Sequence, residues 1–371
     1  MMTEKQEQPI GVPHLNWEVG TAYDFFESLD VLHNPEMYDL RPSWAAGVRS
    51  RLPAEERKLL EEIQSFLWVP IRWIYGLPAP KDATTVLWSL RQIAPAERLA
   101  AITSHGSDSG EDELLAVYKR VAERRSWDQS DEQAIKELIS KEKKEKAYLA
   151  QYMKALPGYL EWWARPDEFG ELYLSALQAY FQVFFAEEER RIAPYLKDAL
   201  ERAQELSSRM SVPDLLVELS QGVHFAEEFK TPELVLAPMY WSTPLIMWDK
   251  ISPDSTMFLF GARPVTASLV PGEVVPDGLL RALKALADPT RLLILRYLNK
   301  EGLTPAQLSR KLRLRAPTVI HHLSTLRLAG LVHLVVDSED NRLYTARLEA
   351  FTNTCSSLEE FLGAENKDTG D

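Results

Sequence analysis

The chain has 371 residues, 45% of them hydrophobic and 26% charged, which is ordinary for a globular protein of two or three domains. Its single cysteine, Cys355, excludes an intrachain disulfide. The polar first residues, 1–13, predict a frayed tail and not a secretory signal peptide. The most apolar early run, residues 66–77, contains Pro70 and Arg72 and is too short to cross a bilayer. We therefore expect a cytoplasmic protein with no membrane contact.

The charge is distributed unevenly along the chain. The formal net charge of −13 argues, taken as an average, against a protein that binds nucleic acid. Residues 277–350, however, carry 12 Lys and Arg against 7 Asp and Glu, a net charge of about +5. The remainder carries 30 basic against 48 acidic residues, a net charge of about −18. A basic module on an acidic body is typical of a DNA-binding domain joined to a domain that does not bind DNA.

Helical signals dominate residues 14–212, which we predict to form a helical domain and a candidate sensor of a small ligand. Acidic residues follow Pro53 in a first turn, and Asp82 suits the N-cap of the next helix. The charged run 141–146 is typical of a solvated helix face. Residues 172–185 are apolar nearly all round, which predicts the buried helix of this domain. We predict helices over residues 23–32, 53–67, 82–90, 111–124, 131–156, 172–185 and 195–210, and one that starts at Pro95.

The pattern changes after residue 212. A short helix over 213–220 precedes three apolar runs broken by Pro or Gly, at residues 223–225, 233–237 and 256–260. These runs predict a small β-meander within a β-containing element, residues 213–263, that packs on the helical domain. Residues 264–276 hold three prolines and a glycine and predict a linker.

All ten tryptophans precede this linker, from Trp17 to Trp248. Large aromatic side chains bury much area in a core, and they also line apolar ligand pockets. Both interpretations fit the sequence, and core packing is the default.

The stretch 277–362 carries the clearest local signals in the chain. Leucines at helical spacing predict a first helix, and Asp288-Pro289-Thr290 ends it and starts a second, with the proline at a first helical position. Thr304 with Gln307 three residues later forms a capping-box pattern at the start of a third helix. A short turn then leads to a fourth helix that opens at Pro317. Two short helices joined by a tight turn have the geometry that inserts a recognition helix into the major groove.

This fourth helix has an apolar inward face and a polar outward face. Gly330 ends it, and two apolar runs, 331–336 and 342–347, flank a polar turn and predict a β-hairpin wing. We expect Arg342, beside that turn, to reach a phosphate or the minor groove. The alternative for each arginine here is a role in surface solubility alone, and we favour DNA contact for Arg315 and Arg342. The predicted inward face is Val319, His322, Leu323, Leu326 and Leu328. The candidate DNA-binding residues are Arg315, Ala316, Thr318, Val319, His321, Thr325 and Arg342.

These residues resemble the ArsR/SmtB-like family of bacterial winged-helix repressors over about 70 of the 371 residues. The matching motifs are Leu286-Ala-Asp-Pro-Thr-Arg291, Leu308-Ser, Pro317-Thr-Val with His322-Leu323, Leu326-Arg, and Ala329-Gly-Leu-Val332. The resemblance implies a homodimer that binds near-palindromic operator DNA and lets go, or rearranges, when it senses a ligand. The part before this domain resembles, loosely, an uncharacterised helical domain that precedes some such winged helices.

The sequence departs from that family in three places. Ile320 stands where members usually carry a serine, so one polar DNA contact is lost. Residues 303–312 lack the cysteines of metal-sensing members, and residues 350–362 lack the histidine and aspartate ligands of others. We therefore expect no metal and no cofactor, and a small-molecule effector would act through the N-terminal domain.

Other groups of residues that could form a functional site give weaker signals. His321 and His322 point about 100° apart on a helix and make poor joint ligands, and we expect His322 to be a packed, hydrogen-bonded core residue. His224 begins a truncated metallopeptidase motif without its second histidine. Cys355 suggests an apolar filler in a final helix, with a redox switch as the alternative.

The sequence thus predicts a mainly α protein with a C-terminal α+β winged helix-turn-helix. The predicted function is a ligand-responsive repressor that binds operator DNA as a homodimer, with no enzymatic activity. The alternative is a helical enzyme or scaffold that uses the winged helix for protein interaction.

Overall fold

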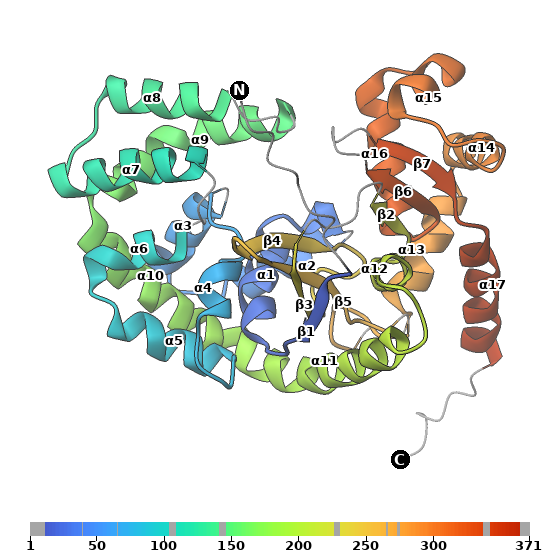
Figure 1. Cartoon of the computed structure of the whole chain (residues 1–371), viewed down its shortest axis with the longest axis horizontal. Helices are drawn as coiled ribbons and strands as arrows, with labels where there is room; N and C mark the ends of the chain where they lie inside the picture. The colour runs from blue at the N-terminus through green and yellow to red at the C-terminus, as the bar shows by residue number, and fades with distance from the viewer. Residues whose placement is uncertain are drawn as a thin grey trace, which may run out of the picture.

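The computed structural model describes residues 12–38, 40–64, 66–103, 109–140, 146–225, 231–264, 266–272, 275–336 and 342–363, and it is mainly helical, as predicted (Figure 1). The helices are α1 (Ala22–His33), η1 (Pro35–Tyr38), α2 (Pro42–Arg49), α3 (Ala54–Ile63), α4 (Ile71–Tyr75), α5 (Ala83–Gln92), α6 (Pro95–Thr103), α7 (Ser109–Arg124), α8 (Gln129–Ser140), α9 (Lys146–Ala164), α10 (Pro166–Tyr180), the π-helical η2 (Phe181–Phe185), α11 (Ala186–Ser207), α12 (Val212–Leu219), α13 (Asp277–Leu286), α14 (Pro289–Leu298), α15 (Pro305–Leu312), α16 (Ala316–Leu328) and α17 (Leu348–Gly363). The strands are β1 (His14–Trp17), β2 (Val223–Phe225), β3 (Glu233–Met239), β4 (Met247–Ser252), β5 (Ser255–Gly261), β6 (Val332–Val336) and β7 (Arg342–Ala346).

The predicted β-meander is instead a mixed sheet of strand order β1-β3-β5-β4. Strands β1, β3 and β5 are parallel, with Asn16 opposite Val235 and Val235 opposite Met257, and only β4 is antiparallel to its neighbour. Strand β2 leaves this sheet and pairs with β6 in the C-terminal domain. The meander prediction was wrong because it assumed that strands next to each other in sequence would pair.

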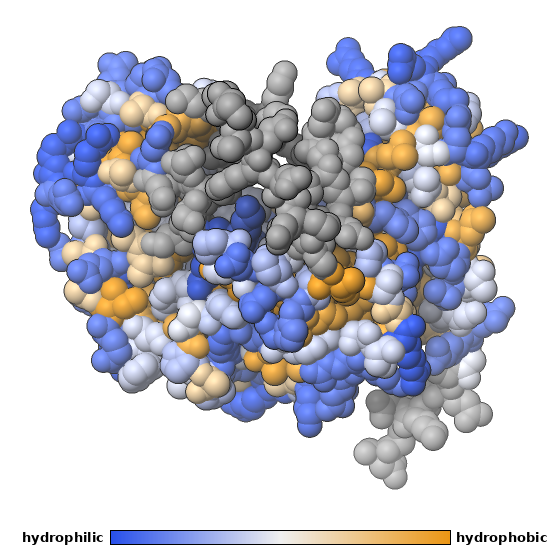
Figure 2. All heavy atoms as spheres, in the orientation of Figure 1, coloured by the Kyte–Doolittle hydropathy of each residue, from blue (hydrophilic) through white to orange (hydrophobic). Residues whose placement is uncertain are grey.

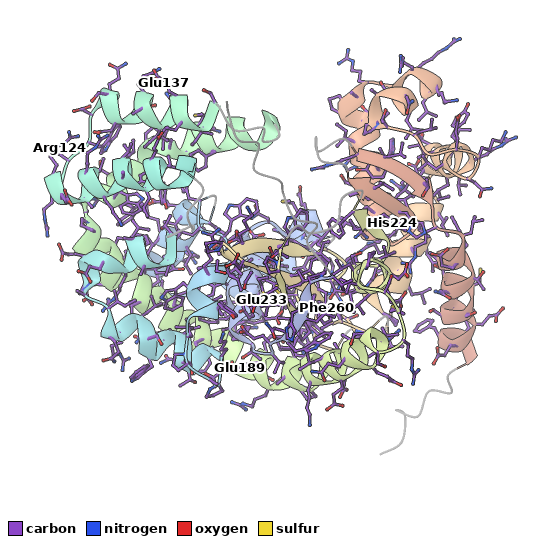
Figure 3. The ribbon with its side chains drawn as sticks, viewed as in Figure 1. Arg124, Glu137, Glu189, His224, Glu233 and Phe260 are labelled. Carbon is purple, nitrogen blue, oxygen red and sulfur yellow. The ribbon has the colours of Figure 1, made fainter. Side chains whose placement is uncertain are left out.

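Both faces of the central strands β3 and β5 are buried. On one face Val235 and Met257 join the large core of the helical domain. On the other, Leu236 and Phe258 pack with leucines of α12 and with Ala203 of α11 (Figure 3 labels Phe260 of the same set). Parallel strands covered on both faces read as continuous apolar runs, which is why these segments show no alternation. Strand β4 alternates between half-buried and exposed residues, as an edge strand does.

We call the part of the chain that precedes α13 the body. Among its described helices α1 is the most deeply enclosed, and the sequence indicated it only as a short helix. Ten of its twelve residues are buried, among them the acidic Asp24 and Glu27. The carboxylate of Asp24 accepts hydrogen bonds from the backbone N–H groups of Tyr240 (2.9 Å) and Trp241 (2.7 Å), which lie just after β3. Burial raises the pKa of Asp24 to about 8. Acidic side chains are typical of a helix face that contacts solvent. The sequence therefore did not indicate that α1, which carries Asp24 and Glu27, is buried.

Several predicted helix boundaries change. The helix predicted over 131–156 is two helices, α8 and α9, and the charged run 141–146 lies outside the described residues apart from the backbone of Lys146. The buried helix predicted over 172–185 begins earlier, at Pro166, and continues through the π-helical segment. Helices α2 and α4 were not predicted. Trp163 and Trp241 lie in the core, whereas Trp68 and Trp88 are more than half exposed.

The segment predicted as a linker, residues 264–276, packs against the body where it is described. Leu269 is 1% exposed, and its carbonyl accepts a hydrogen bond from Arg191 (3.2 Å). Its N–H donates to Asp277 at the start of α13 (2.5 Å). The C-terminal domain is thus attached through a packed segment and through the β2–β6 pairing.

Candidate DNA-binding site

A separate hydrophobic core organises the C-terminal domain. Ile294 and Leu298 of α14, Leu308 of α15, and Val319 and Leu323 of α16 are all buried in it. Strands β6 and β7 form the predicted antiparallel hairpin, and Leu303, before α15, bridges to Tyr344 in β7. Helix α17 is the expected final helix. This core holds the outward face of α16 in a fixed position.

The capping residues identified in the sequence fix the positions at which α14 and α15 begin. The carboxylate of Asp288 accepts a hydrogen bond from the N–H of Arg291 (2.9 Å) at the start of α14. Thr304 and Gln307 form the predicted capping box, in which each side chain bonds the other's backbone (3.3 and 2.8 Å). Arg313 closes α15 in the left-handed conformation at φ +56°. That conformation costs a non-glycine residue energy, and here it makes the tight turn between α15 and α16.

The first turns of α16 present an exposed polar surface. Arg315, Ala316, Thr318 and His321 are exposed, whereas Thr325 is half-buried and its hydroxyl donates to the carbonyl of His321 (3.0 Å). Val319 is a correction to the candidate set, because its side chain is fully buried. It packs in the core with Leu323 and Leu326, so it supports the contact face without belonging to it.

The structure adds two cations that the sequence did not select. Arg310, near the end of α15, and Arg313, in the turn, are exposed and make no ion pair within the described part of the chain. Lys311 beside them is paired with Glu301 at 2.9 Å. Arg310, Arg313 and Arg315 flank the entry to α16, so their charge surrounds the polar surface. In Figure 2, hydrophilic side chains project from the outer end of the domain, where Figure 1 places α15.

The wing matches the prediction in its strands. Val332 of β6 lies opposite Ala346 of β7, and Val336 lies opposite Arg342. The polar turn 337–341 lies outside the described residues. Arg342 is half-buried at the first position of β7. A phosphate contact by this residue therefore stays a prediction.

Two further expectations change, for His322 and Cys355. His322 is only half-buried and makes no hydrogen bond within the described residues, and burial lowers its pKa. Cys355, expected as an apolar filler, is exposed on α17. His224 lies in the extended strand β2 (Figure 3). Its ring centroid is 5.0 Å from that of His333 in β6. No group of three or more His, Cys, Asp or Glu suited to a metal ion occurs among the described residues.

Comparison with known proteins identifies the C-terminal domain. The model of the family described as bacterial regulatory protein, arsR family, matches residues 288–333. A crystal structure of an ArsR family transcriptional regulator matches with 26% sequence identity and a TM-score of 0.22, over 25% of this chain and 96% of that chain. No curated protein matches the chain. Among the described residues, no helix is long and apolar enough to cross a membrane. The family match over residues 288–333 shows that the C-terminal domain carries an ArsR-type helix-turn-helix, the module of a DNA-binding regulator.

Proposed function

We propose that this protein is a ligand-responsive transcriptional repressor that binds operator DNA as a homodimer through α16 and the wing. The observation that carries the proposal is the exposed start of α16. Arg315, Thr318 and His321 face outward there, while Val319 and Leu323 fix the helix from behind. Side chains at the start of a recognition helix are those that reach base edges in the major groove.

The charge distribution supports the same surface. Exposed cations contact phosphates and provide most of the affinity, because they release the counterions condensed on the duplex. Arg310, Arg313 and Arg315 supply such cations at one end of the domain. The acidic remainder of the chain repels DNA, so binding is confined to the C-terminal domain.

The homodimer is part of the proposal because the resemblance to ArsR-type repressors implies near-palindromic sites, whose two-fold symmetry suits two copies of the chain. Two copies would place their recognition helices about 34–36 Å apart, one turn of duplex. The body supplies the candidate effector site, and we expect no catalytic activity from this chain.

The first test compares the affinity of Arg315→Ala and of the unmodified chain for DNA from the region upstream of its own coding sequence. We expect about a tenfold loss, since a hydrogen bond from a charged group contributes about 1.5–3 kcal/mol and part of it is replaced by water. Fluorescence anisotropy with labelled duplex measures it.

The matched control is Arg202→Ala on α11, whose side chain is 75% exposed and far along the chain from the domain. It should bind DNA like the unmodified protein. If Arg315→Ala binds as tightly as Arg202→Ala, then Arg315 is not part of the DNA-binding surface.

A second candidate function is supported by one observation. Ile320 is 49% exposed on α16, and an apolar side chain there suits a protein contact better than a base edge or phosphate. On this alternative the winged helix docks a protein partner. The same anisotropy measurement, repeated at several salt concentrations, decides, because a protein-docking domain would show no salt-dependent binding to duplex DNA.

A further inference from the structure

A small cavity lies where the body meets the C-terminal domain. Its volume is about 130 Å³. The body contributes Thr243, Pro244, Arg263 and Pro264, and the C-terminal domain contributes the start of α13, the end of α16 and the inner side of α17.

The guanidinium of Arg263 is the most unusual group in this cavity. Its residue is only 7% exposed. One terminal nitrogen donates to the carbonyl of Thr243 (2.7 Å), and the other, Nη1, is buried with no hydrogen-bond partner among the described residues. No carboxylate of the described chain forms an ion pair with it. A buried charge without such a partner is strongly destabilising.

Positive charge accumulates around Arg263. Burial and the nearby Arg281 lower the pKa of Arg263 to about 10, which still leaves it charged at neutral pH. Arg281 donates to the carbonyls of Tyr38 (3.1 Å) and Leu328 (3.3 Å), and so it ties the body to α16. Arg347 lines the cavity from the other side and is paired with Glu349 at 3.0 Å. The nearest opposing acid, Asp277, accepts the N–H of Leu269 and does not pair with Arg263.

The N-terminus of α13 adds to the positive charge around the cavity. Its N-cap is Pro276, which provides no side-chain hydrogen bond to the first turn. Gly278 and Leu279 of that turn line the cavity. Uncapped N–H groups at a helix start carry a partial positive charge and favour an anion.

We propose that this cavity binds a small organic acid, with the carboxylate on Arg263 and a short apolar body against α13 and α16. A carboxylate pairs with a guanidinium through charge-assisted hydrogen bonds, which are among the strongest available in proteins. Leu279, Ala282, Leu328 and Ala350 supply the apolar wall. The volume is close to that of a cavity of about 150 Å³ that holds benzene, which limits the apolar body of the ligand to roughly a single ring or a short alkyl chain.

The position of the cavity gives the ligand a route to α16. Leu328, Ala329 and Gly330 at the end of α16 form part of the wall, and Arg281 holds the carbonyl of Leu328. A ligand that engages Arg263 and Arg281 would therefore change the contacts at one end of α16. This regulatory consequence rests on the proposed function, whereas binding of the acid does not.

The test is a calorimetric titration of the full chain with sodium benzoate, sodium butyrate and inorganic phosphate, at constant ionic strength set with sodium chloride. We expect saturable one-to-one binding of benzoate. Arg263→Gln should weaken it about tenfold or more, because the charge-assisted pair is lost. Arg347→Gln should weaken it a few-fold, and Arg202→Gln on the exposed face of α11 should leave it unchanged.

Three outcomes would overturn the proposal. These are no saturable binding of either carboxylate, binding of phosphate alone, and benzoate binding that neither Arg263→Gln nor Arg347→Gln weakens. If Arg263→Gln does not fold, Arg347→Gln decides. DNA binding is measured separately, so a chain that binds benzoate but no DNA contradicts only the regulator proposal. A chain that binds DNA but no small acid contradicts only the cavity.

Discussion

The C-terminal domain and the body differ in how their sequences encode structure. In the C-terminal domain, Asp288, Thr304 and Gln307 fix helix starts through bonds to residues three positions away. In the body, the parallel strands β1 and β3 join residues that are more than 200 positions apart, such as Asn16 and Val235. A module built from local signals is therefore recognisable in one sequence, whereas a body built from distant pairings is not.

The strongest way to test this comparison is a matched pair of core truncations. Leu323→Ala in α16 and Leu177→Ala in α10 each remove a leucine that is at most 1% exposed. Each should lower the free energy of unfolding of its own region by about 2–5 kcal/mol, because a cavity replaces the lost contacts. Since all ten tryptophans precede α13, their fluorescence reports the body, while far-ultraviolet circular dichroism reports both regions.

We expect Leu323→Ala to shift the circular dichroism transition and leave tryptophan fluorescence nearly unchanged. Leu177→Ala should shift both signals. If Leu323→Ala unfolds the tryptophan-containing body equally, the two regions are one cooperative unit and the comparison fails.

The next prediction concerns the acid buried in α1. Burial raises the pKa of Asp24 from 3.8 to about 8, so between these values the folded chain holds a proton that the unfolded chain releases. The stabilisation is complete below about pH 4 and is lost as the pH rises towards 8. Stability should therefore fall by up to about 1.4 kcal/mol per pH unit across this window.

Asp24→Asn should remove that part of the pH dependence and be the more stable form at pH 8. Glu27 and Asp30 also have raised pKa values because of burial, so some slope should remain in the variant. Urea unfolding at several pH values measures the difference. Identical slopes in the two proteins would show that Asp24 is ionised in the folded chain.

The smallest expected effect is at Ile320. Ile320→Ser replaces an exposed apolar side chain on α16, so the free energy of unfolding should change by no more than about 0.5 kcal/mol. Affinity for operator DNA should rise a few-fold, because a hydroxyl group that can form a hydrogen bond replaces a larger apolar side chain at the DNA surface. A loss of DNA affinity would mean that Ile320 itself makes an apolar contact with a base.

The fold of the C-terminal domain could be predicted because its signals are short-range. The helix boundaries are marked by proline at first helical positions, by the capping box at Thr304 and by Gly330 after α16. The strands of the wing follow Gly330 in the sequence. Val319 was wrongly included among the candidate DNA-binding residues, because its position in the first turn of α16 was given more weight than its apolar side chain. Arg310 and Arg313 were missed because helix spacing alone does not show that the left-handed turn brings them beside α16.

The fold of the body could not be predicted in the same way, for physical reasons. Strand β2 lies among body residues in the sequence but pairs with β6, more than 100 residues later. The acids Asp24 and Glu27 gave the most enclosed helix a polar appearance. Arg263 carried no signal as a site, because a single arginine before a proline is typical of an exposed loop. Only the meeting of the body with α13, α16 and α17 makes it part of a cavity.

The most direct measurement is the affinity of the full chain for duplex DNA from its own upstream region as a function of salt concentration. A basic domain that contacts phosphates predicts that the logarithm of the binding constant falls linearly with the logarithm of salt concentration, with a slope of about −0.9 per phosphate contacted. Arg315→Ala should make this slope shallower by about one. Binding that does not depend on salt, or no binding at all, would contradict the assignment of α16 as a DNA-reading helix.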